Sequence, residues 1–142
     1  MSYKLKKNIL NLINHPFLTA SLLYKILKNY FFSDYIEKRA KFFFIKNDLV
    51  KYFKRNDPNE LDPEWTDLKF IYDLVRKRKP HCMVEFGSGV STIAIGLALK
   101  ENDLKDKIIG RLISVDGNKK WIENTKKKID NELKEYIQFH FS

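Results

Sequence analysis

The sequence predicts an α/β fold with a parallel sheet, preceded by a helical extension. Apolar or alternating runs at 82–86, 111–115 and 136–141 have the length and composition of strands. Between them, residues 91–100 and 119–134 carry apolar side chains at helical spacing. Strands that alternate with helices are typical of parallel sheets, and right-handed crossovers give the strand order 3-2-1.

A glycine turn follows the first strand. Residues 82–86 form an apolar run between a proline and a glycine, so we expect this strand to be buried on both faces. Gly87 and Gly89 end the strand, and Ser91 or Thr92 can cap the helix that follows. A strand, a glycine turn and a helix in succession are how open α/β sheets build a nucleotide crevice.

The glycine spacing narrows the class of nucleotide. The dinucleotide fingerprint requires a third glycine three positions after Gly89, where this chain has Thr92. No Gly-Lys-Ser or Gly-Lys-Thr sequence occurs, which excludes a P-loop. An NAD(P)-dependent oxidoreductase is therefore an alternative that the spacing disfavours.

Two segments carry a family resemblance. The run Val84-Glu85-Phe86-Gly87-Ser88-Gly89-Val90-Ser91-Thr92 resembles the first motif of the class I S-adenosylmethionine-dependent methyltransferases, which is a hydrophobic strand, an acid and Gly-x-Gly. The second strand ends in Asp116, and in that family an acid at this place holds the ribose hydroxyls. A carboxylate suits that role because it accepts hydrogen bonds from both hydroxyls of a diol. The resemblance covers residues 62–142 and implies part of a three-layer Rossmann-like domain.

The resemblance implies an enzyme that transfers a methyl group from S-adenosyl-L-methionine to an acceptor that the sequence does not identify. The residues implied to bind the cofactor are Glu85, Gly87, Ser88, Gly89, Ser91, Thr92, Asp116 and Gly117. The glycines let the backbone approach the ligand, and the hydroxyls and free amides at the helix start face its carboxylate.

Three of these positions have further interpretations. Glu85 is expected to order the loop or to hold the cofactor's amino group. The alternative is an acid satisfied by loop amides, and both roles could hold together. Asp116 could instead cap the following helix, for which Asn118 is another candidate. Gly117 is expected to keep the next turn close to the adenosine.

No catalytic residue is assigned from the sequence. His140 is the only histidine expected near the crevice end of a strand, and a lone histidine there is more often structural. His81 is expected at the opposite end of the sheet, and His15 lies in the leading segment. The Cys and His residues do not have zinc-ligand spacing, so no metal is expected.

The sequence ends with the third predicted strand, so the resemblance covers only the front half of a methyltransferase and suggests a truncated enzyme. The first strand is left on a sheet edge, and unpaired edges invite self-association or a partner chain. The alternative function is therefore a non-catalytic cofactor-binding remnant or interaction module that needs a partner to complete the sheet.

Composition and charge separate the chain into two parts. Residues 1–60 carry 12 Lys/Arg and 5 Asp/Glu, a net charge of +7, whereas residues 61–142 carry 15 and 13, a net charge of +2. The turn cluster Asn56–Asn59 is the predicted boundary between an extension, 1–60, and the Rossmann-like part, 61–142. The single cysteine, Cys82, excludes an internal disulfide and suggests a reducing, cytoplasmic location.

The basic extension is expected to be helical. Apolar residues recur at helical spacing in Tyr3–Phe32 and again in Ser33–Asn56. The first segment is expected to pack on the rest of the chain or on a partner, and weak contact of residues 1–32 with an anionic membrane surface is the alternative. The aromatic residues of the second segment, Tyr35 and Phe44 among them, are expected to face a core, which makes nucleic-acid binding the weaker interpretation.

A further helix is expected directly before the first strand. Asp62 is placed to cap it, Pro63 suits its first position, and Trp65 begins its apolar face. The basic run Arg76–Lys79 ends it on the favourable side of the helix dipole.

Overall fold

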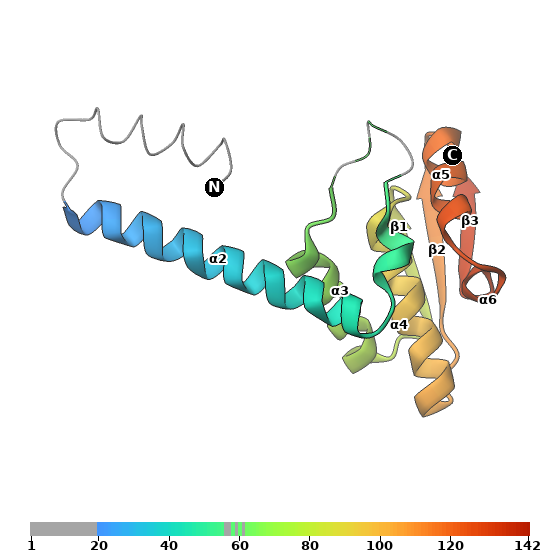
Figure 1. Ribbon diagram of the computed structural model, residues 1–142. Helices are drawn as coiled ribbons and strands as arrows, with labels where there is room; N and C mark the ends of the chain where they lie inside the picture. The colour runs from blue at the N-terminus through green and yellow to red at the C-terminus, as the bar shows by residue number, and fades with distance from the viewer. Residues whose placement is uncertain (1–19, 56–57, 59, 61) are drawn as a thin grey trace. The chain divides into compact units, whose positions relative to one another are not determined.

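The computed structural model describes residues 20–142 apart from 56, 57, 59 and 61 (Figure 1). The chain divides into two compact units, residues 1–36 and 37–142, each of which is described by itself. The elements are α2 (Ala20–Lys46), the 3-10 helix η1 (Val50–Phe53), α3 (Trp65–Arg78), β1 (Cys82–Phe86), α4 (Val90–Asp106), β2 (Arg111–Asp116), α5 (Lys119–Lys128), α6 (Asn131–Lys134) and β3 (Ile137–Phe141).

The three strands form one parallel sheet with β2 in the centre, as Figure 1 shows. Cys82 pairs with Arg111 in the β1–β2 ladder, and Leu112 pairs with Ile137 in the β2–β3 ladder. The predicted α/β class, the parallel strands and the order 3-2-1 are confirmed. Both β1 and β3 are edge strands among the described residues, since each pairs only with β2.

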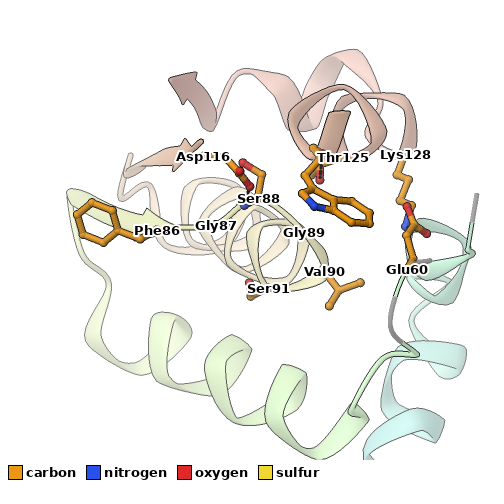
Figure 2. A pocket seen from close by; sticks show the side chains of 11 residues that line it. Glu60, Phe86, Gly87, Ser88, Gly89, Val90, Ser91, Asp116, Thr125 and Lys128 are labelled. Carbon is orange, nitrogen blue, oxygen red and sulfur yellow. Dashed lines mark hydrogen bonds and ion pairs between the residues drawn. The ribbon is translucent and has the colours of Figure 1, made fainter. Parts of the chain in front are cut away.

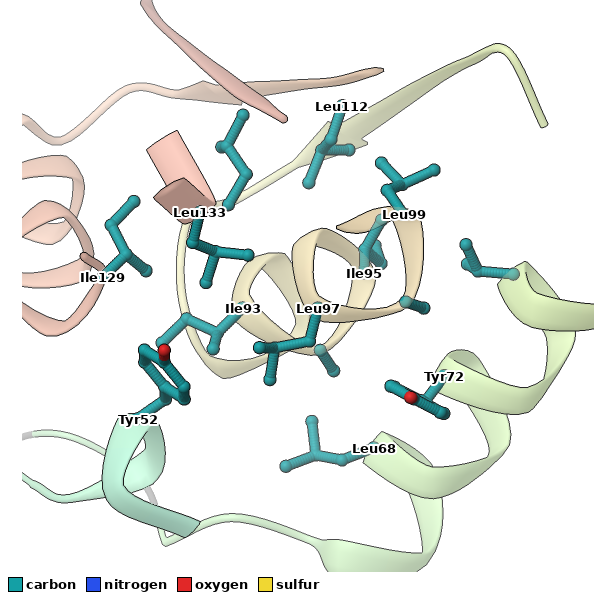
Figure 3. Close-up of a cluster of buried hydrophobic side chains, with 14 of the residues drawn as sticks. Tyr52, Leu68, Tyr72, Ile93, Ile95, Leu97, Leu99, Leu112, Ile129 and Leu133 are labelled. Atoms are coloured by element: carbon teal, nitrogen blue, oxygen red, sulfur yellow. The ribbon is translucent and has the colours of Figure 1, made fainter. Parts of the chain in front are cut away.

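Helix α4 packs on one face of this sheet. Leu112 of β2 is fully buried beneath it, together with Ile93 and Leu99 of α4 itself (Figure 3). Helix α4 approaches β3 closely at Gly96, since a Cβ added there would lie only 2.5 Å from Cδ1 of Ile137. Helix α5 covers the same face, where the Nζ of its Lys126 lies 5.6 Å from the ring centroid of Phe139.

The other face of the sheet is uncovered by the described residues, and here a prediction is wrong. Strand β1 was expected to be buried on both faces, but Val84 is 56% exposed, Phe86 is 86% exposed and Cys82 is exposed as well. The physical reason is that β1 pairs with a strand on one edge only. In addition, α4 and α5 lie on the face of the sheet away from Val84 and Phe86. Of the three layers expected, the described residues supply the sheet and one helical layer.

Helix α4 is longer than the sequence indicates. It was expected to end near Lys100, but it continues to Asp106. The polar side chains of this last part have partners on α3: the fully buried Asn102 donates its amide to the carbonyl of Val75 at 3.1 Å and accepts a hydrogen bond from Arg76. Lys107, with φ of 57°, ends the helix.

The helix predicted over 119–134 is two helices. Ile129 has an extended conformation (φ −102°, ψ 141°), which separates α5 from α6. Asp130 then caps α6, because its Oδ1 accepts the N–H of Leu133 at 2.8 Å. The apolar spacing of this segment predicts that Trp121, Ile122, Ile129 and Leu133 face inward. The last three are buried, whereas Trp121 is half-buried.

Helix α3 begins differently from the prediction. Asp62 was expected to cap it, but Asp62 instead forms an ion pair with Arg55 at 3.1 Å. The cap comes from Glu37, far away in sequence, whose carboxylate accepts the N–H groups of Trp65 at 2.6 Å and Thr66 at 2.9 Å. The basic end of the helix is as predicted, since its last turn holds Arg76, Lys77 and Arg78.

The segment before α3 supplies an aromatic part of the core. Phe44 is fully buried, and its ring centroid lies 5.1 Å from that of Phe53 and 5.6 Å from that of Trp65. The prediction that these aromatic residues face a core is therefore confirmed for Phe44 and Phe53. It is wrong for Tyr35 and Phe42, which are exposed.

Helix α2 runs without a break across the predicted junction between Phe32 and Ser33. Residues 1–19, on which most of the first predicted helix falls, lie outside the described residues. Over the part of the chain that is described, no helix has the length and apolar character needed to cross a membrane.

Candidate cofactor-binding site

The candidate site lies where β1 and β2 end. Because parallel strands end at the same edge of a sheet, the turn after β1 and the turn after β2 are neighbours. The N–H of Gly87 donates to the carbonyl of Val115 at 2.8 Å, which holds the glycine turn against β2. Gly87 has φ of +98°, a conformation that strongly favours glycine.

Asp116 joins the two turns through both of its carboxylate oxygens. Oδ2 accepts the N–H of Ser88 at 2.7 Å, and Oδ1 accepts the N–H of Asn118 at 2.7 Å. An ionised carboxylate has about four acceptor positions, so each oxygen retains a lone pair for a ligand. Asn118 is the N-cap of α5, because its side chain accepts the N–H of Lys120 at 2.9 Å. The predicted capping role of Asn118 is confirmed, and Asp116 does not occupy that position.

Glu85 lies behind the glycine turn and fixes the start of α4. The hydroxyl of Ser91 donates to its Oε1, and the hydroxyl of Thr92 donates to its Oε2 at 2.6 Å. The same Thr92 oxygen accepts the N–H of Gly89 at 2.9 Å, so Glu85 is linked to the turn. The helix begins at Val90 with Gly89 as N-cap, and neither Ser91 nor Thr92 is the cap.

Burial raises the pKa of Glu85 above its ordinary value of 4.5. The hydrogen bonds from Ser91, Thr92 and Ser114 act in the opposite direction, and the nearby charge of Asp116 raises the pKa further. Through the hydroxyl groups of Ser91 and Thr92, Glu85 is linked to the glycine turn. The alternative interpretation, an acid satisfied by loop amides, had different partners.

Ser114 belongs to the site and was missed in the sequence. Its side chain is fully buried, and its Oγ lies 2.8 Å from the Oγ of Ser88. The register pairs Glu85 with Ser114, so both side chains are on the face of the sheet that α4 covers. The central position of β2 in the sheet is the signal that could have found it.

A cavity of about 400 Å³ opens beside the glycine turn (Figure 2). Such a volume lies within the range usual for small-molecule sites. The residues that line it are Glu60, Phe86, Gly87, Ser88, Gly89, Val90, Ser91, Asp116, Trp121, Thr125 and Lys128.

Five of the predicted site residues line this cavity: Gly87, Ser88, Gly89, Ser91 and Asp116. Glu85 and Thr92 lie behind the lining and hold it in place. Gly117 is outside the lining, and a Cβ there would lie 3.4 Å from the carbonyl oxygen of Ser142. The structure thus brings the two motifs together and separates Gly117 from the cavity they form.

Residues of helix α5, together with Glu60 before α3, line the side of the cavity opposite the glycine turn. Trp121, Thr125 and Lys128 follow one another at spacings of four and three, so they share a face of α5, and that spacing could have identified them. Lys128 forms an ion pair with Glu60 at 2.8 Å, with side chains only 7% and 10% exposed. Figure 2 shows this pair at one end of the cavity and Asp116 with Ser88 towards the other. No sequence signal marked Glu60.

The cavity has features that fit a nucleoside-like ligand. A Cβ placed on Gly87 or Gly89 would meet no atom within 4 Å, so the backbone there faces open space. Phe86, Val90 and Trp121 offer apolar surface, Asp116 offers acceptors for a diol, and the ion pair of Lys128 with Glu60 lies at the far end.

Neither described histidine lines the cavity. His140 of β3 is exposed and pairs with Val115 of β2 in the sheet. His81 lies before β1, and its Nδ1 is 3.1 Å from the carbonyl oxygen of Ile109. Within the described residues, no group of three or more His, Cys, Asp and Glu side chains could hold a metal ion.

A scan against protein-family models found no match, and a search of curated proteins found none either. The interpretation of the site therefore depends on its own geometry.

Proposed function

We propose that the cavity beside Gly87–Gly89 binds S-adenosyl-L-methionine and that the chain belongs to a methyltransferase. One observation carries the proposal: the Asp116 carboxylate lies 2.7 Å from the backbone N–H of Ser88 in the glycine turn. The acid proposed to bind the ribose diol therefore lies directly beside a backbone that a ligand can approach closely.

Each part of the cavity has a role in this proposal. Asp116 accepts hydrogen bonds from the ribose hydroxyls, and Gly87 and Gly89 leave room for the ligand against the backbone. The first turn of α4, held by the hydrogen bond from Ser91 to Glu85, presents free backbone N–H groups to the carboxylate of the methionyl group.

The chemistry expected of the bound cofactor is transfer of an electrophilic methyl group from its sulfonium. The protein's own residues contribute by holding the reactants in line and by limiting the access of water. No side chain of the cavity is assigned as a base, so the acceptor is expected to be one that attacks without a protein base or with one supplied elsewhere.

Calorimetry with three ligands tests the proposal on the full 142-residue chain. S-adenosylhomocysteine and S-adenosylmethionine should bind, whereas reduced nicotinamide adenine dinucleotide should bind much more weakly, because Thr92 replaces the third glycine of the dinucleotide fingerprint. Stronger binding of the nicotinamide nucleotide would favour an oxidoreductase and contradict the proposal. Binding of none of the three would contradict both.

A second function is supported by the open edge of the sheet. β1 pairs only with β2, so its other edge is open among the described residues. Val84 and Phe86 of β1 are also exposed on the uncovered face, whereas parallel sheets usually have both faces covered. A cofactor-binding module that needs a partner to complete its sheet would have this property. Without a partner, that module should bind S-adenosylhomocysteine but transfer no methyl group. Methyl transfer by the isolated chain would rule this second function out.

A further inference from the structure

Helix α2 exposes a group of aromatic side chains in the first compact unit. Phe31, Phe32 and Tyr35 expose 65%, 64% and 57% of their surface. Successive residues of a helix are about 100° apart, so these three lie within an arc of about 100°. A contiguous aromatic group of this kind on a helix usually marks a contact with something else.

The same arc carries positive charge. The exposed Lys28 precedes Phe31 and Phe32 by three and four residues, which places it beside them on the helix surface. Over Ala20–Lys46, six Lys or Arg residues accompany two acids, an excess of four positive charges. One of those acids, Glu37, has its carboxylate bound by the backbone of α3, which takes it away from the solvent side.

The part of α2 in the second unit has a similar composition on its exposed side. Phe42 and Ile45 are exposed there, and so are Lys38 and Arg39. Its buried side is different, since it presents Phe44 to the core. Exposed apolar and basic residues therefore occur together in each part of the helix.

We infer that the aromatic-basic face of α2, defined by Lys28, Phe31, Phe32 and Tyr35, binds the surface of an anionic lipid membrane. Helices that lie in the membrane interface combine aromatic residues, which enter the headgroup region, with Lys and Arg, which contact anionic lipids. The charges at Lys28 and Asp34 would be costly in the hydrocarbon core, so the helix is expected to lie along the surface.

Two other occupants fit the face less well. A second copy would bring equal positive charges together, which repel one another. Single-stranded nucleic acid is bound by aromatic residues that lie in a positively charged groove, whereas this face is the convex side of a single helix. Charge complementarity with anionic lipid has neither difficulty.

Vesicle flotation of the full chain tests the inference. The wild type should float with vesicles of phosphatidylcholine and phosphatidylserine, should not float with phosphatidylcholine alone, and should be released by high salt. The variant F31S/F32S/Y35S should partition about tenfold less onto the anionic vesicles. The matched control is F70S, because Phe70 on α3 is 66% exposed and lies outside the face.

Circular dichroism and thermal unfolding establish that each variant is folded. If the triple variant does not fold, K28E keeps the aromatic residues and should still reduce binding to anionic vesicles. The inference is overturned if the wild type does not float with phosphatidylserine or if F70S reduces flotation as much as the triple variant. It is also overturned if the triple variant abolishes self-association or RNA binding and leaves flotation unchanged.

Discussion

Asp116 has two tasks at once, because the oxygens proposed to bind the ribose already accept hydrogen bonds from Ser88 and Asn118. The carboxylate is therefore held in place before any ligand arrives. Pre-organisation of this kind lowers the conformational cost of binding. The same arrangement means that a change at Asp116 affects the position of the turn as well as the contact with the ligand.

Asp116→Ala should weaken binding of S-adenosylhomocysteine by about 1–3 kcal/mol, since it removes a charged hydrogen-bond partner. Calorimetry measures the effect. Asp73→Ala is the matched control, because Asp73 is an exposed acid on α3 that pairs with Lys69. Equal affinity of wild type and Asp116→Ala would show that this carboxylate does not hold the ligand.

Glu85 should make the stability of the fold depend on pH. Its raised pKa means that the folded state keeps the proton to a higher pH than the unfolded state. As the pH rises from about 4.5 through the folded-state pKa, that proton is lost and the contribution of Glu85 to stability falls.

The melting temperature of Glu85→Gln relative to wild type should therefore be more favourable at pH 7 than at pH 4. Glu64→Gln, at an exposed position of the same chain, is the control substitution. A difference between Glu85→Gln and wild type that is constant across this range would contradict the assignment.

At the scale of elements, long-range side-chain contacts decide where helices begin and end. The start of α3 is capped by Glu37 of α2, and the last turns of α4 are held by the contact between Asn102 and Val75. The 3-10 helix η1 is tied to α6, because the hydroxyl of Tyr52 donates to the Asp130 carboxylate. Burial, followed by this contact, raises the pKa of Tyr52 to about 12.

Glu37→Ala should destabilise the fold by about 1 kcal/mol, the usual cost of losing a helix cap. Urea unfolding gives the free energy. Glu64→Ala is the control, because Glu64 occupies the N-cap position and makes no side-chain capping bond. Equal effects of the two changes would mean that the contact with Glu37 contributes nothing to the helix.

Burial alone would raise the pKa of Glu37, but hydrogen bonds from Thr66 and Trp65 lower it below 4.5 overall. The stabilisation by Glu37 should therefore be present above pH 4.5 and be lost as the pH falls through the lower folded-state value. The difference between wild type and Glu37→Ala should shrink at low pH.

For the whole molecule, the sequence predicted what depends on local pattern. The three strands, the glycine turn and the buried positions of Ile122 and Leu133 follow from periodicity and from the conformational preference of glycine. Where both partners of a contact lie far apart in sequence, the prediction was wrong or missing. Glu37 capping α3 and Glu60 paired with Lys128 are contacts of this kind.

The burial of β1 was mispredicted for another reason. An apolar composition indicates that a strand is suited to a buried position. It does not indicate whether another element packs on each face of that strand. Val84 and Phe86 are apolar and exposed, while the similarly apolar Leu112 is fully buried. Only the arrangement of the whole sheet distinguishes them.

The two faces of the sheet should respond differently to substitution. Leu112→Ala should cost about 2–5 kcal/mol, as for other buried leucines. Phe86→Ser should change stability by less than about 0.5 kcal/mol, as for an exposed position. Urea unfolding at two protein concentrations measures both, and a large, concentration-dependent cost at Phe86 would mean that another copy covers this face.

The ion pair between Glu60 and Lys128 connects the candidate cavity to the stretch of chain before α3. A shortened protein that starts after Glu60 would retain the glycine turn and Asp116 but would leave the ammonium of Lys128 enclosed without its counter-charge. It would also lose Phe44 and Phe53 from the core. Anyone transplanting this cavity to another scaffold would therefore have to carry over the stretch upstream of the sheet together with the strands.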